Sequence, residues 1–167
     1  EDLEAQGMTG LVIDLRDNPG GNLDTVCDIL DLILPEGTIV STKDKNGEGE
    51  TYTSDEEHKL EIPLSVLTNG NSASASEIFA GAVQDYGVGT LVGTTTFGKG
   101  IVQQIFPLTD GTSIKLTISE YFTQKGRNIH GTGIDPDVEV EYEYNEEDPA
   151  ADNQLEKAIE IVKGNGM

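Results

Sequence analysis

Positive charge is scarce in this sequence. Only 10 of its 167 residues are Lys or Arg, against 31 Asp or Glu, so the net charge is −21 with neutral His. A field of this sign repels phosphate backbones and anionic lipid headgroups. The composition therefore argues against nucleic-acid binding and against docking to acidic membranes, and we expect no nucleic-acid partner.

Long apolar runs and paired cysteines are also absent. No stretch approaches the roughly 20 apolar residues that a membrane-spanning helix needs. The single Cys27 cannot form an intrachain disulfide and leaves the redox compartment open. The sequence begins at Glu1 with no Met and no signal segment, so we expect a fragment of a longer chain. The length still suits one domain with a real core.

Strand and helix signals alternate along the first hundred residues. Buried strands are predicted at residues 10–15, 64–68 and 90–92, a further strand at 39–42, and helices at 22–34 and 78–86. This alternation predicts parallel strands joined by crossover helices, hence an α/β layered domain. Residues 101–106 and 113–118 flank a Thr-Asp-Gly-Thr turn and predict a hairpin.

The remaining segments are mostly acidic. Residues 43–59 predict an exposed hairpin or loop, 138–142 a last strand, 145–151 a linker, and 154–163 a terminal helix. We therefore divide the chain into a core at residues 1–145 and a linker with a C-terminal helix at 146–167.

Ser74 lies in a serine-rich segment between a predicted strand and a predicted helix. Backbone N–H groups and the positive end of the helix dipole favour a nucleophile at such a position. Ser74 and Glu77 also fit a capping box, in which the hydroxyl only satisfies a backbone donor. The segment alone leaves both roles open.

A serine nucleophile needs a base. His58 lies in the acidic loop and is expected to be solvated, while His130 lies in a Gly-rich turn and leaves a Ser-His-Asp triad open. Lys99 lies in an otherwise apolar, Gly-rich segment, where desolvation would make a neutral amine available as a base. Alternatively, Lys99 only extends from a loop into solvent.

Two further patterns imitate ligand-binding loops. Residues 93–99 match the start of a phosphate-binding loop, but Gly100 stands where Ser or Thr would bind magnesium, and a strand follows instead of a helix. Residues 44–55 imitate a calcium loop without flanking helices and with Asp55 in place of the final Glu. The sequence therefore disfavours a nucleotide-hydrolysing site at residues 93–99 and favours an exposed hairpin at residues 44–55.

Five segments together resemble one known family. Its signatures are matched, in order, by GLVIDLRDNPGG at residues 10–21, NSASASEI at 71–78, TFGKGIVQ at 96–103, GIDPD at 133–137 and DNQLEKA at 152–158. The sequence is thereby similar to the carboxy-terminal processing, or tail-specific, serine proteases of peptidase family S41. The matches cover nearly the whole chain.

The resemblance implies a role for each matching residue. Ser74 would be the nucleophile, Lys99 the general base, and Gln103 a residue that holds Lys99 in place. The backbone N–H of Ala75, together with that of Gly20 or Gly21, would form the oxyanion hole. Ser72, Ser76 and Asp85 are expected to be structural.

The resemblance also implies a fold and a function. The fold would be a layered ClpP/crotonase-like (ββα) core with a mixed sheet and a C-terminal hairpin. The activity would be endopeptidase cleavage near protein C-termini through an acyl-enzyme, without metal or organic cofactor. The alternative is a crotonase-like core that binds peptide and is inactive as an isolated fragment.

Partners and location are implied in the same way. The partners would be substrate C-termini and the PDZ domain of a parent chain, which these residues do not include, and a homo-oligomer is left open. The location would be outside the cytoplasm of a bacterium.

Overall fold

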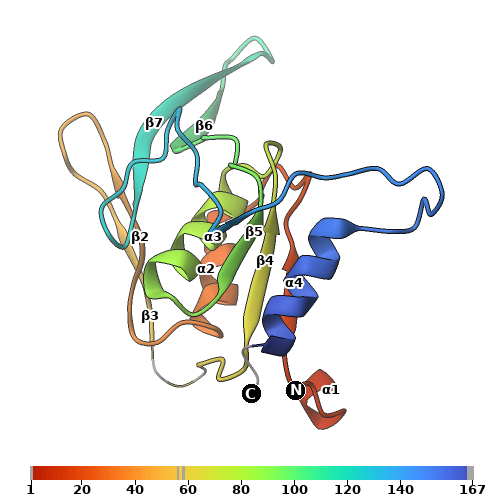
Figure 1. Cartoon of the computed structure of the whole chain (residues 1–167). Helices are drawn as coiled ribbons and strands as arrows, with labels where there is room; N and C mark the ends of the chain where they lie inside the picture. Colours follow the sequence, from red (N-terminus) through yellow and green to blue (C-terminus); the bar gives the residue numbers. More distant parts are fainter. Residues whose placement is uncertain (1, 56, 58, 165–167) are drawn as a thin grey trace.

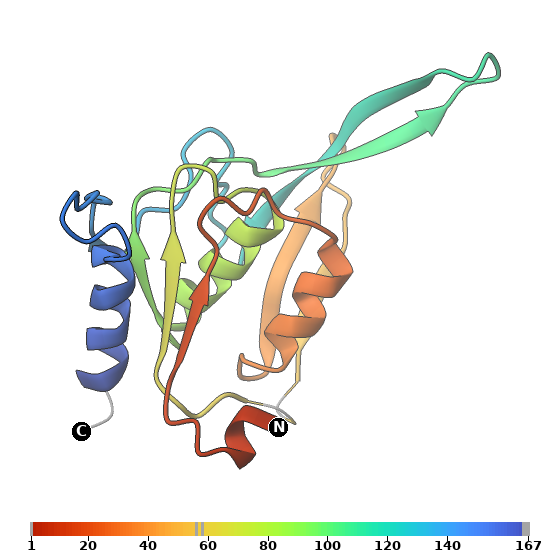
Figure 2. The ribbon, with the colours of Figure 1, turned by 90° about the vertical axis from the view of Figure 1, so that its right-hand side faces the viewer.

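The computed structural model describes residues 2–55, 57 and 59–164. Its elements form four layers (Figures 1 and 2). Helix α4 (Asn153–Gly164) covers one face of a parallel sheet, and helices α2 (Leu23–Asp31) and α3 (Ala75–Tyr86) cover the other. A second, antiparallel sheet packs on the far side of α2 and α3. The two inner helices therefore lie between two sheets.

The parallel sheet has the order β1-β4-β5-β8. These strands span Leu11–Asp14, Leu64–Thr68, Thr90–Gly93 and Val138–Glu139. Every residue of β4 is buried, since its neighbours β1 and β5 flank it and helices cover both faces. This position explains why the segment combines the apolar Leu64, Val66 and Leu67 with only small polar residues, Ser65 and Thr68.

The antiparallel sheet has the order β3-β2-β7-β6. These strands span Thr51–Ser54, Gly37–Lys43, Ser113–Thr123 and Ile101–Pro107. The outer part of β6 and β7 extends from the body as a two-stranded ribbon (Figure 2). This projecting part exposes apolar side chains, among them Ile105, Phe106, Ile114 and Leu116. The base of the ribbon contacts α3 through β7, where Tyr121 reaches the segment before the helix.

Local sequence signals explain where the helices begin and end. The side chain of Asn22 caps α2 by accepting a hydrogen bond from the Thr25 backbone N–H at 2.9 Å. Gly87, with a φ of 67°, ends α3 in the left-handed conformation that glycine adopts easily. Helix α1 (Asp2–Ala5) is a single short turn. None of the described helices is both long and apolar enough to cross a membrane.

The α/β class and the predicted elements are confirmed, with three differences of detail. The parallel and antiparallel pairings fall into two separate sheets, whereas we had expected a mixed sheet. Helix α2 ends at Asp31, three residues before the predicted end at residue 34, and a turn with hydrogen bonds from Ile33 and Leu34 to the Leu30 carbonyl leads on to Pro35. Strand β8 is only two residues long, because its partner β5 ends at Gly93, where a φ of 126° turns the chain away.

An ion-pair cluster joins α4 to the end of β1. The Arg16 guanidinium lies 2.7 Å from carboxylate oxygens of both Asp14 and Asp152. The Asp152 carboxylate also caps α4 by accepting from the Leu155 N–H at 2.9 Å. The division at residue 145 stays a prediction, although Ala158 of α4 is buried against Leu67 and Val92 of the parallel sheet.

Because of this ion-pair cluster, we expect the stability of the fold to decrease at acidic pH. Hydrogen bonds from Arg16 hold the pKa of Asp152 below its ordinary value. A carboxyl with a depressed folded-state pKa stabilises the fold above its unfolded pKa of about 3.9, and this contribution is lost as the pH falls through the lower folded-state value. Asp152→Asn should therefore lower the free energy of unfolding by about 1 kcal/mol at pH 7, and by less near pH 3. Urea unfolding at both pH values measures the difference.

The matched control is Glu160→Gln, which removes an acid of α4 whose pair with Lys157 is exposed. It should change the free energy of unfolding by less than about 0.5 kcal/mol at either pH. An Asp152→Asn protein as stable as the parent at pH 7 would show that the cluster contributes nothing.

Candidate active site

Ser74 occupies a strained backbone position between β4 and α3. Its φ of 58° and ψ of −117° lie outside the regions that residues with a Cβ normally adopt. Such a conformation costs on the order of 1–3 kcal/mol and persists only where surrounding contacts enforce it. A sharp strand-to-helix turn of this kind presents a serine hydroxyl at the N-terminus of a helix.

The predicted capping box is formed at this end of α3. The Glu77 carboxylate accepts from the Ser74 backbone N–H at 2.9 Å. The Glu77 N–H also has the main-chain carbonyl of Ser74 as an acceptor, at 2.8 Å. The Ser74 side chain also faces the Glu77 N–H in this box, but the main-chain carbonyl of Ser74 satisfies that donor as well, so the cap does not depend on the hydroxyl.

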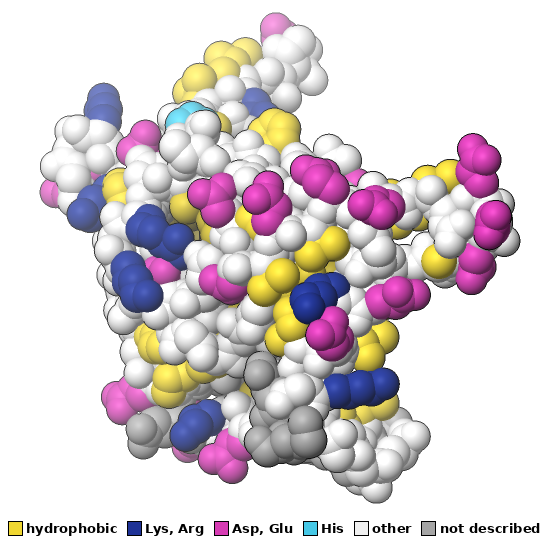
Figure 3. Space-filling model, viewed as in Figure 1, with side chains coloured by type: hydrophobic (Ala, Val, Ile, Leu, Met, Phe, Trp, Pro, Cys, Tyr) yellow, Lys and Arg dark blue, Asp and Glu magenta, His cyan; other side chains and the backbone are white. Residues whose placement is uncertain are grey.

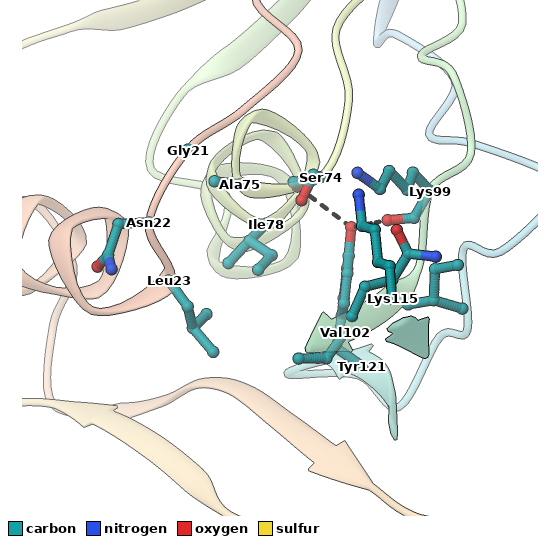
Figure 4. Close-up of a pocket in the computed structure, with 12 residues that line it drawn as sticks. Gly21, Asn22, Leu23, Ser74, Ala75, Ile78, Lys99, Val102, Lys115 and Tyr121 are labelled. Carbon is teal, nitrogen blue, oxygen red and sulfur yellow. Dashed lines mark hydrogen bonds between the residues drawn. The ribbon is translucent and has the colours of Figure 1, made fainter. Parts of the chain in front are cut away.

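Ser74 and Lys99 share one cavity of about 310 Å³ (Figure 4). Lys99 comes from the loop between β5 and β6 and is half-buried. The cavity is lined by Gly21, Asn22, Leu23, Ser74, Ala75, Ile78, Lys99, Ile101, Val102, Gln103, Lys115 and Tyr121. The sequence-predicted nucleophile and base are therefore in the same cavity, although 24 positions of the sequence separate them.

A loop containing both candidate oxyanion glycines packs against the Ser74 segment. A Cβ on Gly20, whose φ is 93°, would lie 2.5 Å from the Ala73 carbonyl oxygen and 2.7 Å from the Ala75 nitrogen. Only glycine therefore fits this approach. The Gly20 N–H donates to the Asn18 side chain at 2.9 Å, whereas the N–H groups of Gly21 and Ala75 have no acceptor among the described residues. Gly21 and Ala75 also line the cavity, and Gly20 does not.

Ser72 and Ser76 bind this loop, in agreement with the structural role expected of them. Ser72 Oγ donates to the Leu15 carbonyl at 2.7 Å, and Ser76 Oγ donates to the Asn18 carbonyl at 3.0 Å. The Asn18 carbonyl also accepts from the Ala73 N–H at 3.0 Å. These bonds fix the position of the glycine loop relative to Ser74.

Glu77 has a larger role than the sequence indicates. Its carboxylate is fully buried and accepts four hydrogen bonds. One oxygen accepts from Thr96 Oγ1 and the Gly98 N–H, both at 2.6 Å. The other accepts from the backbone N–H groups of Lys99 at 2.8 Å and Ser74 at 2.9 Å. One carboxylate therefore holds the Ser74 and Lys99 segments together.

Tyr121 is a second residue that sequence reasoning missed. It lies on β7, is 2% exposed, and its hydroxyl binds the main-chain carbonyls of both Ser74 and Lys99. Figure 4 shows these two bonds as dashed lines. Burial raises the pKa of Tyr121, so the hydroxyl stays a neutral donor at neutral pH. Tyr121 lies beyond the strand predicted at residues 113–118, and nothing in the sequence signalled this contact.

Gln103 lines the cavity, but its observed partner is a neighbour in the hairpin. Its side-chain amide donates to Thr117 Oγ1 at 3.4 Å. Holding Lys99 in place therefore stays a prediction for Gln103. Asp85 is buried at the other end of α3 and pairs with Arg127, as expected for a structural residue.

The alternative base His130 and the thiol of Cys27 do not line the cavity. His130 is exposed and does not line the cavity. His58 lies outside the described residues. Cys27 is buried, and burial raises the pKa of its thiol to about 11, which suppresses the reactive thiolate.

The two segments that imitate ligand-binding loops, residues 93–99 and 44–55, adopt the structures that the sequence favours. A strand, β6, follows Lys99 where a phosphate-binding loop would need a helix. The calcium-like segment is the β2–β3 hairpin, in which the Asp44 carboxylate accepts from the backbone N–H groups of Asn46 and Glu48.

Known proteins resemble this chain in sequence and in fold. Residues 1–140 match the model of peptidase family S41. The chain is 46% identical over 165 residues to a carboxyl-terminal-processing protease of Synechocystis, covering 97% of this chain and 39% of that protein. It is 43% identical over 140 residues to the carboxy-terminal processing protease CtpB of Bacillus subtilis, covering 83% of this chain and 29% of that protein.

A solved structure shows the same fold. The photosystem II D1 C-terminal processing protease superimposes with a TM-score of 0.79 at 34% sequence identity. The match covers 96% of this chain and 40% of that protein. The chain thus spans less than half the length of each of these relatives.

Proposed function

Because the chain belongs to peptidase family S41, and within it to the carboxyl-terminal processing proteases, we propose that it hydrolyses peptide bonds with Ser74 as nucleophile and Lys99 as general base. One observation carries the proposal. A strained serine at a helix N-terminus, a lysine and two backbone N–H groups without acceptors surround one cavity. The relatives named above are proteases, and this arrangement supplies what acyl transfer needs.

Lys99 acts first as a general base and then as a general acid. Ser74 Oγ attacks the carbonyl carbon of the scissile bond while its proton passes to the neutral Lys99 amine. The backbone N–H groups of Ala75 and Gly21 stabilise the negative oxygen that forms. As the C–N bond breaks, the Lys99 ammonium protonates the leaving amine, and the acyl group stays on Ser74 as an ester.

Water completes the cycle. Lys99 takes a proton from a water molecule, the resulting hydroxide attacks the ester, and the proton returns to Ser74 Oγ as the carboxylic acid product leaves. The lining of the cavity contains no Asp or Glu among the described residues, so no side-chain carboxylate there competes with Lys99 for the role of base. Gln103, Glu77 and Tyr121 would position the two reacting residues.

The proposal extends to substrates and partners. An extended segment near a protein C-terminus is the substrate, and the PDZ domain of a longer parent chain is a partner. The parent acts outside the bacterial cytoplasm. These points rest on resemblance to proteins of which this chain matches only a part.

A neutral fluorophosphonate tests the nucleophile directly. Ser74 Oγ should displace fluoride from phosphorus, and the mass increase should map to the peptide that contains Ser74. Ser74→Ala should abolish the labelling, whereas the exposed Ser113→Ala should leave it unchanged. A chain that stays unlabelled would overturn the proposal and favour a peptide-binding core without activity.

A further inference from the structure

A second lysine lies at the candidate active site. Lys115 comes from β7, opposite Ile105 in the hairpin, and lines the same cavity as Ser74 and Lys99. Figure 4 shows the Lys115 side chain pointing from the strand toward Ser74. The catalytic scheme proposed above assigns no step to this residue.

The surroundings of Lys115 are unusual for this protein. Acidic residues outnumber basic ones by 31 to 10 in the sequence, and acidic side chains stand out over the long loop before α4 in Figure 3. The cavity reverses this balance, since its lining holds two lysines and no Asp or Glu among the described residues. The local electrostatic potential therefore favours binding of a negatively charged ligand group here more than elsewhere on the surface.

Lys115 also has no partner for its charge. Among residues 2–55, 57 and 59–164, its amino group makes no hydrogen bond or ion pair. Arg16, Arg127 and Lys157 are paired with carboxylates, whereas within the described part of the chain Lys115, like Lys45 and Lys99, is not. The ammonium of Lys115 is thus free to bind a group that enters the cavity.

We propose that Lys115 determines substrate specificity by binding a carboxylate of the peptide close to the scissile bond. The inference rests on the proposed function, because a peptide must occupy the cavity. In an unmodified peptide the only anionic groups at neutral pH are the terminal α-carboxylate and the side chains of Asp and Glu. A charge-assisted hydrogen bond from an ammonium to either group is among the stronger polar contacts.

The apolar lining completes the description of the substrate. Leu23, Ile78, Ile101 and Val102 contribute hydrophobic surface to the same cavity. A peptide that places an apolar side chain beside its carboxylate would match both features. We therefore expect substrates with an apolar residue at the cleavage region and a negative charge within reach of Lys115.

Competition with the fluorophosphonate tests this inference in the full chain. Three peptides of one apolar sequence serve as competitors: one with a free C-terminal carboxylate, one with a C-terminal amide, and one amidated peptide with an internal Glu. The free-acid or the Glu peptide should protect Ser74 about tenfold better than the neutral amide. The better of the two identifies the source of the carboxylate.

Variants then assign the effect to Lys115. Lys115→Gln should remove the advantage of the negative peptide, and Lys115→Arg should retain it. Lys45→Gln, which removes the same charge from the exposed β2–β3 turn, should leave the advantage unchanged.

The outcomes separate the two proposals. If the probe labels Ser74 but all three peptides compete equally, or Lys115→Gln keeps the discrimination, the role of Lys115 is wrong and the proposed function stands. If the probe does not label Ser74 in the parent chain, the proposed function fails and this inference fails with it.

Discussion

Lys99→Ala should lower kcat/KM for peptide hydrolysis by about 10⁴-fold or more, and Ser74→Ala by a similar factor. The double variant should be little worse than either single one, because two residues that act in one proton transfer are not additive. Initial rates on an unfolded protein substrate measure the effect. Lys45→Ala is the matched control, because it removes an exposed lysine that does not line the cavity.

The size of the expected loss follows from the chemistry of the site. A serine hydroxyl is a weak nucleophile unless a base takes its proton, and the described lining of the cavity offers no histidine or carboxylate, only a second lysine, Lys115, on the hairpin. The oxyanion N–H groups would remain, so a small residual rate is expected. Folding should be unaffected, because the Lys99 contacts to Glu77 and Tyr121 use backbone atoms.

Two results would contradict this assignment. Cleavage by Lys99→Ala at a rate near that of the parent would show that another group is the base. An activity that rises around pH 6.5 and disappears in His130→Ala would identify that group as histidine. The exposed position of His130 outside the cavity argues against the second result.

The elements of the fold were predictable because their signals are local. Apolar runs, the Asn22 cap, Pro35 and Gly87 each act within a few residues, and the structure places strands and helices accordingly. The division into two sheets was not predictable in this way. It depends on β7 pairing with β2, about 80 residues earlier in the sequence, and no local pattern encodes such a partner.

The candidate site could also be predicted only as far as its signals are local. Ser74, Lys99 and the glycine loop were found because each lies in a recognisable motif at the end of a strand. Tyr121 and Lys115 were missed because alternation along a strand predicts which residues share a face, but not which loop that face meets. The strain that supports a nucleophile at Ser74 could be seen only in the backbone, since a φ of 58° is invisible in a capping-box pattern.

Glu77 offers the sharpest test of how the two reacting residues are positioned. Glu77→Gln preserves the size of the side chain but leaves one oxygen to serve four donors. The Thr96 hydroxyl can rotate to accept from the new amide N–H, so the amide nitrogen should face Thr96 and Gly98. The Gly98 N–H would then be buried without an acceptor, and the bonds to Ser74 and Lys99 would lose their charge assistance.

We expect Glu77→Gln to lower the free energy of unfolding by about 3 kcal/mol, because charge-assisted hydrogen bonds in a buried site are lost and one buried donor is left unpaired. Urea unfolding measures this loss, and Glu120→Gln on the exposed face of β7 is the control that should change stability by less than about 0.5 kcal/mol.

A purely structural role and a positioning role then differ in a second measurement. At a temperature where the Glu77→Gln chain is fully folded, a positioning role predicts that fluorophosphonate labelling of Ser74 slows at least tenfold, since the strained turn and the Lys99 loop are no longer held by one charged group. Substrate protection of Ser74 should change little, because Glu77 does not line the cavity. Labelling at the parent rate in the folded variant would reduce Glu77 to a stabilising residue, and the alignment of Ser74 with Lys99 would then have to depend on Tyr121 and the glycine loop.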